Sequence, residues 1–522
     1  MTPSRSGADR TGGIAAGLCF ALVCAVTLLA YARSFSSSFQ LDDNSQIIAN
    51  PVMARPSVQG ILEFGGARVV PFVTLVLNYR LGGEEPFGYH VVNFAIHLLA
   101  TLAVFRLALA LCRTPRLRDT WLAAQSLAFA TAAAFVFACH PIQIQAVTYV
   151  VQRMSAMAAM FYVGSVVLYV RARNAQLGLG PGRVAWAYVG SALLALGAFF
   201  SKENAASLPL AILLTELAFY PSADGGRLLR LAPFAALVLV IPLTWWMFGI
   251  RPGYRFDPDA PVGQHIKDLL DLLIFRASPG SHVTSLEYAL TQAVVIPRYL
   301  RMVVLPWGFN VDHDVPTARA LAGPVFGGLA VLAGLLGCAL WAWRRSIIIA
   351  FAILWLFVGL SVESSVLPIR DAMVEHRIYL AMPGVALIAG WVFAWTFQRR
   401  RATALIFGAA CVLLLASLTF ARNEVWRTPL ALWTDALAKS PNKARVQVNI
   451  GTALHDQHRL DEAIAHYCQA LALDPDHRQA RHNLDVALAQ QLEQRAERGE
   501  DIDAIIGPDG SFQVARPDPC SQ

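Results

Sequence analysis

The polar motifs that could carry chemistry in this chain lie at the ends of long apolar stretches. They are Leu41-Asp42-Asp43-Asn44, His140-Pro141, Ser201-Lys202-Glu203-Asn204, Asp312-His313-Asp314 and Glu375-His376-Arg377. Carboxylates of this kind accept protons, whereas lysine, arginine and histidine side chains bind phosphate. Ionisable groups are costly at a bilayer, so their repeated placement at the ends of apolar stretches predicts a site built at one membrane surface.

Asp42 and Asp43 are the candidate catalytic residues. A hydroxyl group that acts as a nucleophile must lose its proton, and a positioned carboxylate accelerates such a step by about 10²–10⁴-fold. Successive side chains point apart in an extended segment, so we expect one carboxylate to act as the base and its neighbour to hold the loop or a cation. The sequence leaves this assignment open, and a turn or helix cap is the alternative interpretation of the pair.

Basic side chains at the predicted outer ends of spans are candidates for binding a phosphate group. Arginine can bind phosphate oxygens through two parallel hydrogen bonds. The alternatives are structural ion pairs within Glu375–Arg377 and Lys202–Glu203, and an arginine that merely reaches the membrane interface. The candidate phosphate-binding residues are Arg377, His376, Lys202 and Arg153.

Histidine spacing permits a metal hypothesis. His90, Asn93 and His97 fall on one face of a predicted helix, where His140 and His313 could join them with Asp42, Asp312 or Asp314. The alternative is that these histidines are hydrogen-bonded packing residues of a helix bundle. No cofactor follows with certainty from the sequence, and a divalent cation is the one that it allows. The supporting site residues are Glu375, Glu203, His90, His97, His140, Asp312, His313 and Asp314.

A membrane scaffold must position these motifs, and the composition provides one. The chain has 522 residues, of which 56% are hydrophobic and 15% are charged, and its mean hydropathy is +0.49. A soluble chain of this length would carry far more charged surface. The formal net charge of +7 does not indicate nucleic acid, because most of the excess arginine lies in short loops between apolar stretches. We therefore predict an integral, multi-pass membrane protein that has the bilayer as a partner and binds no nucleic acid.

Basic clusters in the loops predict the topology. They are Arg5/Arg10, Arg113/Arg116/Arg118, Arg171/Arg173/Arg183, Arg227/Arg230, Arg344/Arg345 and Arg399/Arg400/Arg401. If these loops are cytoplasmic, as the positive-inside rule predicts, the polar motifs and the C-terminus lie outside. About eleven crossings follow from the apolar stretches. Their approximate bounds are 13–32, 90–111, 119–138, 154–171, 184–200, 205–220, 231–249, 323–342, 346–362, 378–396 and 402–420.

Two apolar segments have a second interpretation. Residues 291–306 are short for a span and carry Arg298 and Arg301, so we expect a re-entrant or interfacial helix there. The first apolar stretch resembles a signal peptide with a cleavage site at Ala30-Tyr31-Ala32, although its apolar part is longer than a signal core.

The loops and the cysteines complete the prediction for the membrane part. The long outer loops, 33–89 and 250–321, contain repeated Pro and Gly and are expected to carry short amphipathic helices. The chain has 8 cysteines without CxxC or Cys/His metal spacing, which predicts inert thiols.

After residue 421 the chain becomes polar, helical and repetitive. Trp433, Ala436 and Pro441 recur one repeat later as Tyr467, Ala470 and Pro475. This is the tetratricopeptide (TPR) pattern, in which small residues let two helices approach and large residues fill the gap between them. The predicted domains are therefore 1–421 for the membrane domain, 422–490 for the TPR repeats and 491–522 for a disordered tail.

The order of the motifs carries a family resemblance. It consists of Asp42-Asp43, His140-Pro141 and a stretch ending in Arg153, Lys202-Glu203, Glu375-His376-Arg377-Ile378-Tyr379-Leu380, and Arg422-Asn423 leading into TPR helices. This order resembles that of the transmembrane and TPR-containing protein O-mannosyltransferases and their bacterial relatives, which belong to the GT-C glycosyltransferases. The resemblance covers nearly the whole chain, although the repeat array is shorter here and His376 interrupts the family's usual Glu-Arg pair.

The resemblance implies an all-α, GT-C-like membrane bundle that transfers a sugar from a polyprenyl-phosphate carrier to an acceptor outside the cytoplasm. It also makes residues 375–377 the first candidate for binding the donor phosphate. TPR repeats bind polypeptides, so we expect the acceptor to be a protein Ser or Thr hydroxyl. Two alternatives stay open: the same enzyme class with a glycolipid or polysaccharide acceptor, and a non-catalytic TPR scaffold for envelope assembly. Short loops, high Ala content and few repeats favour a bacterial inner membrane, with the active site and the TPR repeats on the periplasmic side.

Overall fold

The computed structural model describes residues 5–180, 182–220, 226–247, 283–498 and 520. All regular elements within these ranges are helices, so the predicted all-α class is confirmed. The chain divides into two compact units. Unit 1 contains Met1–Phe309 and Pro316–Glu424, and unit 2 contains Asn310–Val315 and Val425–Gln522. The first part of the predicted outer loop 250–321 and most of the predicted tail 491–522 lie outside the described residues.

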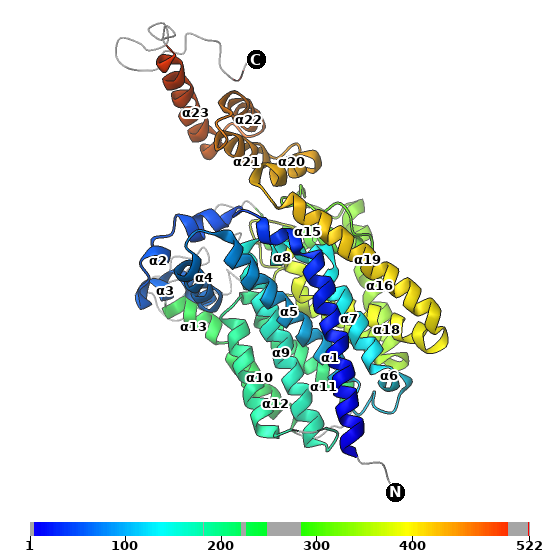
Figure 1. Cartoon of the computed structure of the whole chain (residues 1–522). Coiled ribbons are helices and arrows are strands. Elements are labelled where there is room, and N and C mark those ends of the chain that lie inside the picture. Colours follow the sequence, from blue (N-terminus) through cyan, green and yellow to red (C-terminus); the bar gives the residue numbers. More distant parts are fainter. Residues whose placement is uncertain (1–4, 181, 221–225, 248–282, 499–519, 521–522) are drawn as a thin grey trace, which may run out of the picture. The chain divides into compact units, whose positions relative to one another are not determined.

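Unit 1 is a bundle of long helices (Figure 1). Helix α9 (Arg153–Gln176) packs against α5 (Pro86–Leu111) and α10 (Val184–Phe199). Helix α7 (Ser126–Cys139) packs against α18 (Met382–Arg399), α5 and α1 (Arg5–Ala30). Other helices of this unit include α4 (Val69–Gly82), α11 (Leu208–Phe219), α12 (Arg227–Leu237), α13 (Val240–Met247), α15 (Ser285–Val304), α16 (Gly323–Arg345), α17 (Ile347–Leu360) and α19 (Arg401–Val425).

Glycines let α18 approach its neighbours closely. A Cβ atom on Gly390 would lie 2.6 Å from the carbonyl oxygen of Phe129 in α7, and one on Gly384 would lie still closer to the carbonyl oxygen of Ala352 in α17. Any larger residue would push the helices apart. The short helix η7 (Glu375–Leu380), which leads into α18, is therefore attached to a firmly packed helix.

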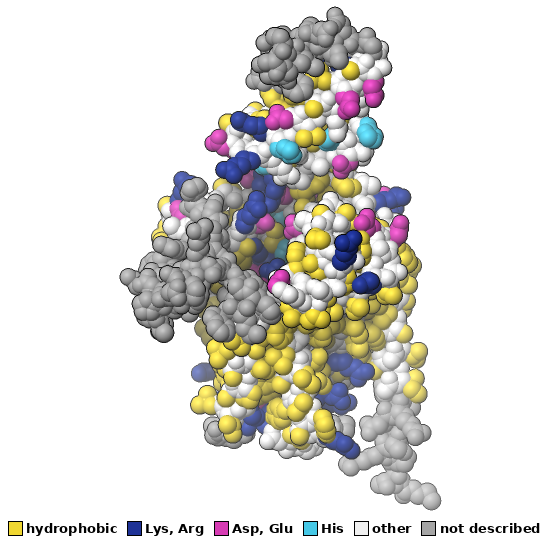
Figure 2. Space-filling model, turned by 90° about the vertical axis from the view of Figure 1, so that its left-hand side faces the viewer, with side chains coloured by type: hydrophobic (Ala, Val, Ile, Leu, Met, Phe, Trp, Pro, Cys, Tyr) yellow, Lys and Arg dark blue, Asp and Glu magenta, His cyan; other side chains and the backbone are white. Residues whose placement is uncertain are grey.

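The described helices confirm a multi-pass membrane protein. Seven of them are long and apolar enough to cross a membrane, and α7 with the bent segment Pro141–Val147 makes an eighth. Figure 2 shows hydrophobic side chains covering much of this bundle, with Lys and Arg side chains at its lower end. The seven are Gly13–Ala30, Val58–Gly82, Pro86–Leu111, Val150–Gln176, Arg227–Thr244, Gly323–Arg345 and Arg401–Val425.

Helices occur at all eleven predicted crossings, but fewer have the length and composition of a span. Helices α10 and α17, for example, are apolar but contain only 16 and 14 residues. Conversely, Val58–Gly82 is a candidate span of 25 residues where the sequence predicted a loop. Its glycines and Pro71 suggested the loop, yet Pro71 lies in the first turn of α4 (Val69–Gly82), where its missing N–H costs no helical hydrogen bond. Gly66 adopts a φ of 51° that joins α3 (Val58–Gly65) to the next turn.

Helix α15 is longer than the predicted segment 291–306. It has 20 residues and begins with a capping box, in which Thr284 accepts from the Glu287 N–H and Glu287 accepts from the Thr284 N–H. Arg298 and Arg301 lie within it, and it is not among the candidate spans of the described residues.

Unit 2 is a series of packed helices in the part of the chain where the sequence predicts TPR repeats. Helices α20 (Pro429–Lys439), α21 (Ala444–His455), α22 (Leu460–Leu473) and α23 (Arg478–Glu497) each pack on the next. A Cβ atom on Gly451 would lie 2.5 Å from the ring of Tyr467, so a small residue of α21 faces a large one of α22.

One pair of cysteines differs from the prediction of inert thiols. Cys468 of α22 and Cys520 form a disulfide, so the expectation is wrong for this pair. Their sequence separation of 52 residues gave no sign that the end of the chain returns to α22. The other 6 cysteines are free.

Candidate active site

A buried, broken segment between α7 and α9 organises the candidate site. Pro141 follows the end of α7, and the segment Pro141–Val147, which contains the short helices Pro141–Gln143 and α8 (Ile144–Val147), makes an angle of 53° with α7. A third short helix, Val150–Gln152, leads into α9. Residues 140–159 are all buried. A broken helix exposes main-chain groups that a continuous helix would satisfy internally, so this segment can bind other parts of the chain.

The two aspartates of the first loop have different environments. Leu41 adopts a left-handed φ of 51°, which costs a residue with a side chain about 1–2 kcal/mol. Asp43 is 1% exposed and accepts hydrogen bonds from the N–H groups of Gln40 (3.0 Å) and Val151 (2.8 Å). Asp42 is exposed, and its N–H donates to the Tyr149 hydroxyl at 3.0 Å. Asp43 therefore fastens the loop to the broken segment, and Asp42 is the carboxylate presented outward.

Burial also changes the acidity of Asp43. Burial raises the pKa of this carboxyl to about 7, although the N–H groups of Gln40 and Val151 act in the opposite direction. The charge of Asp42 adds to the increase. Asp43 thus titrates near neutral pH, while its hydrogen bonds fix the loop.

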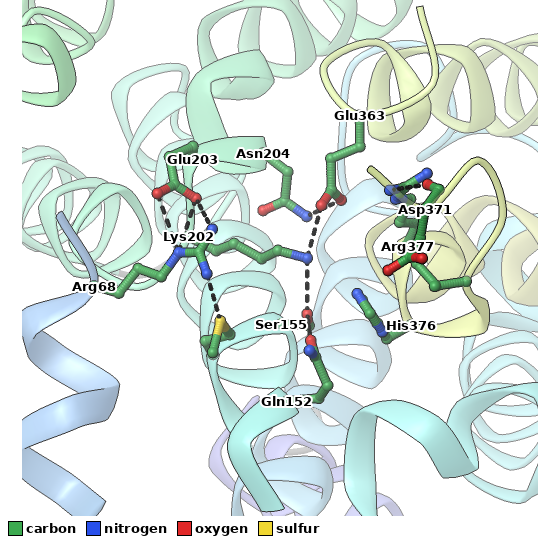
Figure 3. A network of polar contacts seen from close by, with 12 residues as sticks. Arg68, Gln152, Ser155, Lys202, Glu203, Asn204, Glu363, Asp371, His376 and Arg377 are labelled. Atoms are coloured by element: carbon green, nitrogen blue, oxygen red, sulfur yellow. Dashed lines mark hydrogen bonds and ion pairs between the residues drawn. The ribbon is translucent and has the colours of Figure 1, made fainter. Parts of the chain in front are cut away.

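A second set of residues centres on Lys202 (Figure 3). The Lys202 ammonium lies 2.7 Å from Glu363 Oε1 and donates to Ser155 Oγ at 3.0 Å. Asn204 Nδ2 donates to the other oxygen of Glu363 at 3.0 Å. The Lys202 and Glu363 side chains are 6% and 12% exposed, so this ion pair is largely removed from water. Burial opposes the charge on Glu363, yet Lys202 and Arg377 hold the pKa of this carboxyl below its usual value.

Arg68 provides a second cation beside this pair. Its guanidinium donates through Nε and Nη2 to Glu203, with an Nη2–Oε2 distance of 2.9 Å. The Arg68 side chain is 45% exposed, which leaves part of the group accessible. Lys202 and Glu203 are neighbours in sequence but pair with different partners, because the extended backbone of Lys202 directs the two side chains apart.

Arg377 and His376 approach from η7. The buried Arg377 guanidinium donates to the carbonyl oxygens of Asp371 (2.6 Å) and Ala372 (3.1 Å) and to the Tyr288 hydroxyl (3.3 Å). Its short contacts are thus with neutral oxygens rather than with carboxylates. The His376 N–H donates to Gln145 Oε1 at 2.8 Å, which ties η7 to the broken segment.

The His376 ring is surrounded by positive charge. Burial lowers its pKa well below the ordinary value, and Lys202, Arg377 and Arg68 lower it further. His376 is therefore a neutral imidazole at pH 7. It can contribute hydrogen bonds to a phosphate, but it does not contribute the charge expected of it.

Arg153 and three histidines have contacts that join helices. The fully buried Arg153 guanidinium donates to Asn93 Oδ1 (2.6 Å), Thr74 Oγ1 (3.1 Å) and the Tyr89 carbonyl oxygen (3.1 Å), which links α9 to α4 and α5. The rings of His90, His97 and His140 each lie about 3 Å from a main-chain carbonyl oxygen, in Ser37, Ala138 and Val303 respectively.

The remaining predicted residues lie elsewhere. Glu375 is buried at the start of η7. Asp312 belongs to unit 2, where its carboxylate pairs with Lys443 and with Arg445, whose Nε donates at 2.6 Å. The His313 carbonyl oxygen also accepts from Lys443. Asp314 is exposed. Within the residues that the structure describes, no group of three or more His, Cys, Asp or Glu side chains could hold a metal ion.

Sequence reasoning missed Glu363, Arg68 and Tyr149. Glu363 follows the apolar stretch 346–362, so a carboxylate at the end of a span was the available signal. Arg68 was hidden in a segment predicted to be a loop. Tyr149 carried no signal, because a tyrosine near a span end is common at membrane interfaces.

Comparisons with known proteins give relatives but no matching family profile. A protein O-mannosyl-transferase of Caenorhabditis elegans is 22% identical over 482 residues, covering 88% of this chain and 63% of the relative. Human TMTC1 is 26% identical over 532 residues, covering 92% of this chain and 58% of the relative. Mouse TMTC4 is 24% identical over 523 residues, covering 85% and 64%. Both of these are also named protein O-mannosyl-transferases, and the chain spans 58–64% of the length of the three relatives.

Two solved structures of ArnT from Cupriavidus metallidurans, one bound to undecaprenyl phosphate and one in the apo state, align with TM-scores of 0.43 and 0.44. They are 15% and 16% identical and cover 96% of this chain and 82% of theirs. The family similarity rests on the sequence relatives and not on these two structures. Over 85–92% of its length this chain is similar to the transmembrane and TPR-containing protein O-mannosyltransferases, which confirms the resemblance predicted from the order of its motifs.

Proposed function

We propose that this protein is a membrane glycosyltransferase that transfers a sugar from a polyprenyl-phosphate carrier to a Ser or Thr hydroxyl of a protein outside the cytoplasm. One observation carries the proposal: an exposed carboxylate, the Lys202 ammonium and the short helix η7, which carries Arg377, are all attached to the buried stretch 140–159. Asp42 is held through Tyr149, Lys202 through Ser155 and His376 through Gln145. A base and a phosphate site at one end of a membrane bundle are what transfer from a lipid phosphate requires. The similarity to protein O-mannosyl-transferases supports the same reaction class.

Asp42 is the proposed general base and Asp43 its positioning residue. In the reaction, the acceptor oxygen bonds to the anomeric carbon while the bond from that carbon to the phosphate oxygen of the carrier breaks. Asp42 takes the hydroxyl proton, and the lipid phosphate leaves with the bonding electron pair. This division of roles follows from exposure, because Asp42 can meet an acceptor and the 1% exposed Asp43 cannot without opening the loop.

Arg377 is the proposed main ligand of the donor phosphate. Arg68 and Lys202 already face carboxylates, whereas the contacts of Arg377 are with a hydroxyl and two carbonyl oxygens. A phosphodiester carries one negative charge, which would balance this cation in a site where water is excluded. Lys202 and Arg68 would add charge at the edge of the site, and His376 a neutral hydrogen bond. We assign Arg153 to positioning α4, α5 and α9.

The proposed location is a bacterial inner membrane, with the site and unit 2 on the periplasmic side. The Cys468–Cys520 disulfide supports this side for unit 2, because disulfides persist in the periplasm and are reduced in the cytosol. The helical repeats of unit 2 are the proposed binding surface for the acceptor polypeptide.

Mass spectrometry of envelope glycopeptides tests the proposal in cells that carry the wild type, Asp42→Asn, Asp119→Asn or no copy, at matched membrane levels. Asp119 is the control, because it is an exposed carboxylate in the loop after α5. We expect Ser/Thr-linked glycopeptides to vanish without the protein, to fall at least about 100-fold with Asp42→Asn and to persist with Asp119→Asn. Unchanged glycopeptides in the deletion strain would contradict the proposal and direct attention to a glycolipid or polysaccharide acceptor. Function retained by Asp42→Asn would instead favour a scaffold.

A further inference from the structure

A basic cavity lies at the far ends of α5 and α9 from the candidate active site. Both helices begin near that site, where Val151 binds Asp43 and Ser155 binds Lys202. The cavity is formed near their last turns by Arg106 and Arg171 and by the loop that follows α5. From Ser155 to Arg171 the rise of α9 is about 24 Å, most of the thickness of a bilayer core. The cavity is therefore a separate location on the opposite side of the membrane.

The cavity has two adjoining lobes that share Leu109 and Arg113. The smaller has a volume of about 110 Å³ and is lined by Arg106, Arg113 and Arg171 together with Asn174. The larger has a volume of about 440 Å³, within the size range of small-molecule sites, and includes Arg118. Apolar side chains, such as Leu109 and Leu179, complete the lining.

The charge of the cavity is one-sided. No acidic residue lines either lobe, and within the described part of the chain Arg106, Arg113 and Arg171 form no ion pair. Arg118 pairs with Asp119 at 3.1 Å on the rim. Three guanidinium groups that are close together and not neutralised repel one another, so an anion bound among them would stabilise the arrangement.

The floor of the cavity is fixed in place. Asn174 is 3% exposed; its Nδ2 donates to the carbonyl oxygen of Ala110 at 3.1 Å, and its Oδ1 accepts from the Tyr220 hydroxyl at 2.8 Å. These bonds join the ends of α5 and α9 and hold Arg106 and Arg171 on adjacent helices. The arginines therefore project from a rigid base rather than from a flexible loop alone.

We propose that this cavity binds the phosphate head group of an anionic phospholipid in the leaflet opposite to the active site. Arginines at the ends of membrane helices lie at the depth of head groups, and basic pockets between such helices bind anionic lipids. The apolar part of the lining fits the glycerol and first acyl carbons, which inorganic phosphate lacks. The inference does not depend on the proposed transfer reaction.

Native mass spectrometry of the full-length protein in detergent tests the inference. Phosphatidylglycerol, phosphatidylcholine and inorganic phosphate would be titrated separately into the wild type and into Arg113→Ala/Arg171→Ala. The matched control is Arg116→Ala/Arg344→Ala, which removes the same charge from exposed arginines that do not line the cavity. Size-exclusion profiles would confirm that all three proteins are folded.

We expect phosphatidylglycerol to bind the wild type and the control alike, and the cavity variant about 30-fold more weakly, since each arginine contributes about fivefold. Phosphatidylcholine should bind much more weakly than phosphatidylglycerol. Equal losses in the cavity variant and the control would overturn the inference, because they would show a general effect of charge. Equal binding of phosphatidylcholine would also overturn it. If inorganic phosphate bound as tightly as phosphatidylglycerol, the ligand would be free phosphate and the lipid assignment would fail.

Discussion

Removing one charge of the Lys202–Glu363 ion pair should destabilise the protein more than removing both charges. The two side chains are 6% and 12% exposed and lie 2.7 Å apart. Lys202→Met leaves the Glu363 carboxylate buried without its cation, and Glu363→Gln leaves the ammonium buried without its anion. Each single change is therefore expected to cost about 3–5 kcal/mol. The double variant removes both charges and should cost about 1–3 kcal/mol, so the midpoints of these ranges give a coupling energy of about 6 kcal/mol.

The assay is a double-mutant cycle measured by unfolding in mixed micelles of increasing SDS content. Arg118 and Asp119 form the matched control pair, because their side chains are 49% and 81% exposed at a separation of 3.1 Å. Coupling in this exposed pair should stay below about 1 kcal/mol. Glycosyl transfer by the double variant adds a second measurement. A protein that folds but does not transfer would show that these charges act in the reaction as well as in the fold.

A coupling energy for Lys202–Glu363 as small as that of the control would refute the reasoning. It would mean that water reaches the pair and that the low dielectric assumed for the phosphate site does not exist. The assignment of Arg377 rests on the same exclusion of water, so it would lose its support as well.

Three further predictions concern other parts of the chain. The pKa of Asp43 is about 7 in the folded protein and about 3.9 in an unfolded chain. Its stabilising effect is therefore complete below about pH 4 and is lost as pH rises through 7. Hydrogen exchange in residues 38–45, corrected for intrinsic rates, should increase from pH 6 to 8, and Asp43→Asn should remove this dependence. Asp312→Asn should destabilise unit 2 by about 1–3 kcal/mol, because its two cationic partners are only 26% and 36% exposed, and faster exchange in α20 and α21 would detect this. Alkylation of the unfolded, unreduced protein should label 6 cysteines and spare Cys468 and Cys520, whereas labelling of all 8 without reduction would contradict the disulfide.

The all-α class, the membrane scaffold and the family resemblance could all be predicted from the sequence. They depend on composition, on apolar length and on motif order, which are properties of the chain itself. Lys202 and Arg377 could be proposed as site residues for a similar reason, since a cation at the end of an apolar span is costly and therefore conspicuous.

The pairing of these residues could not be predicted. The sequence suggested that Lys202 might pair with Glu203, its neighbour, but adjacent side chains of an extended segment point apart. Lys202 pairs instead with Glu363, and Glu203 with Arg68, each far away in the chain. Such partners depend on how the helices pack, and packing leaves no local pattern.

The broken segment explains how three distant loops come to form one site. Within the broken segment, the Tyr149 hydroxyl accepts from the Asp42 N–H and the Val151 N–H donates to Asp43; just beyond it, in the first turn of α9, the Ser155 hydroxyl accepts from Lys202. Because Val151 binds Asp43 through its main-chain N–H, the side chain at position 151 gives no indication of this hydrogen bond. This hydrogen bond requires instead that a helix be interrupted in the protein interior, where the main-chain groups left without helical partners must be hydrogen-bonded by other residues. The aspartate loop supplies one of those partners, so the proposed base is positioned by the same break that bends the chain after α7.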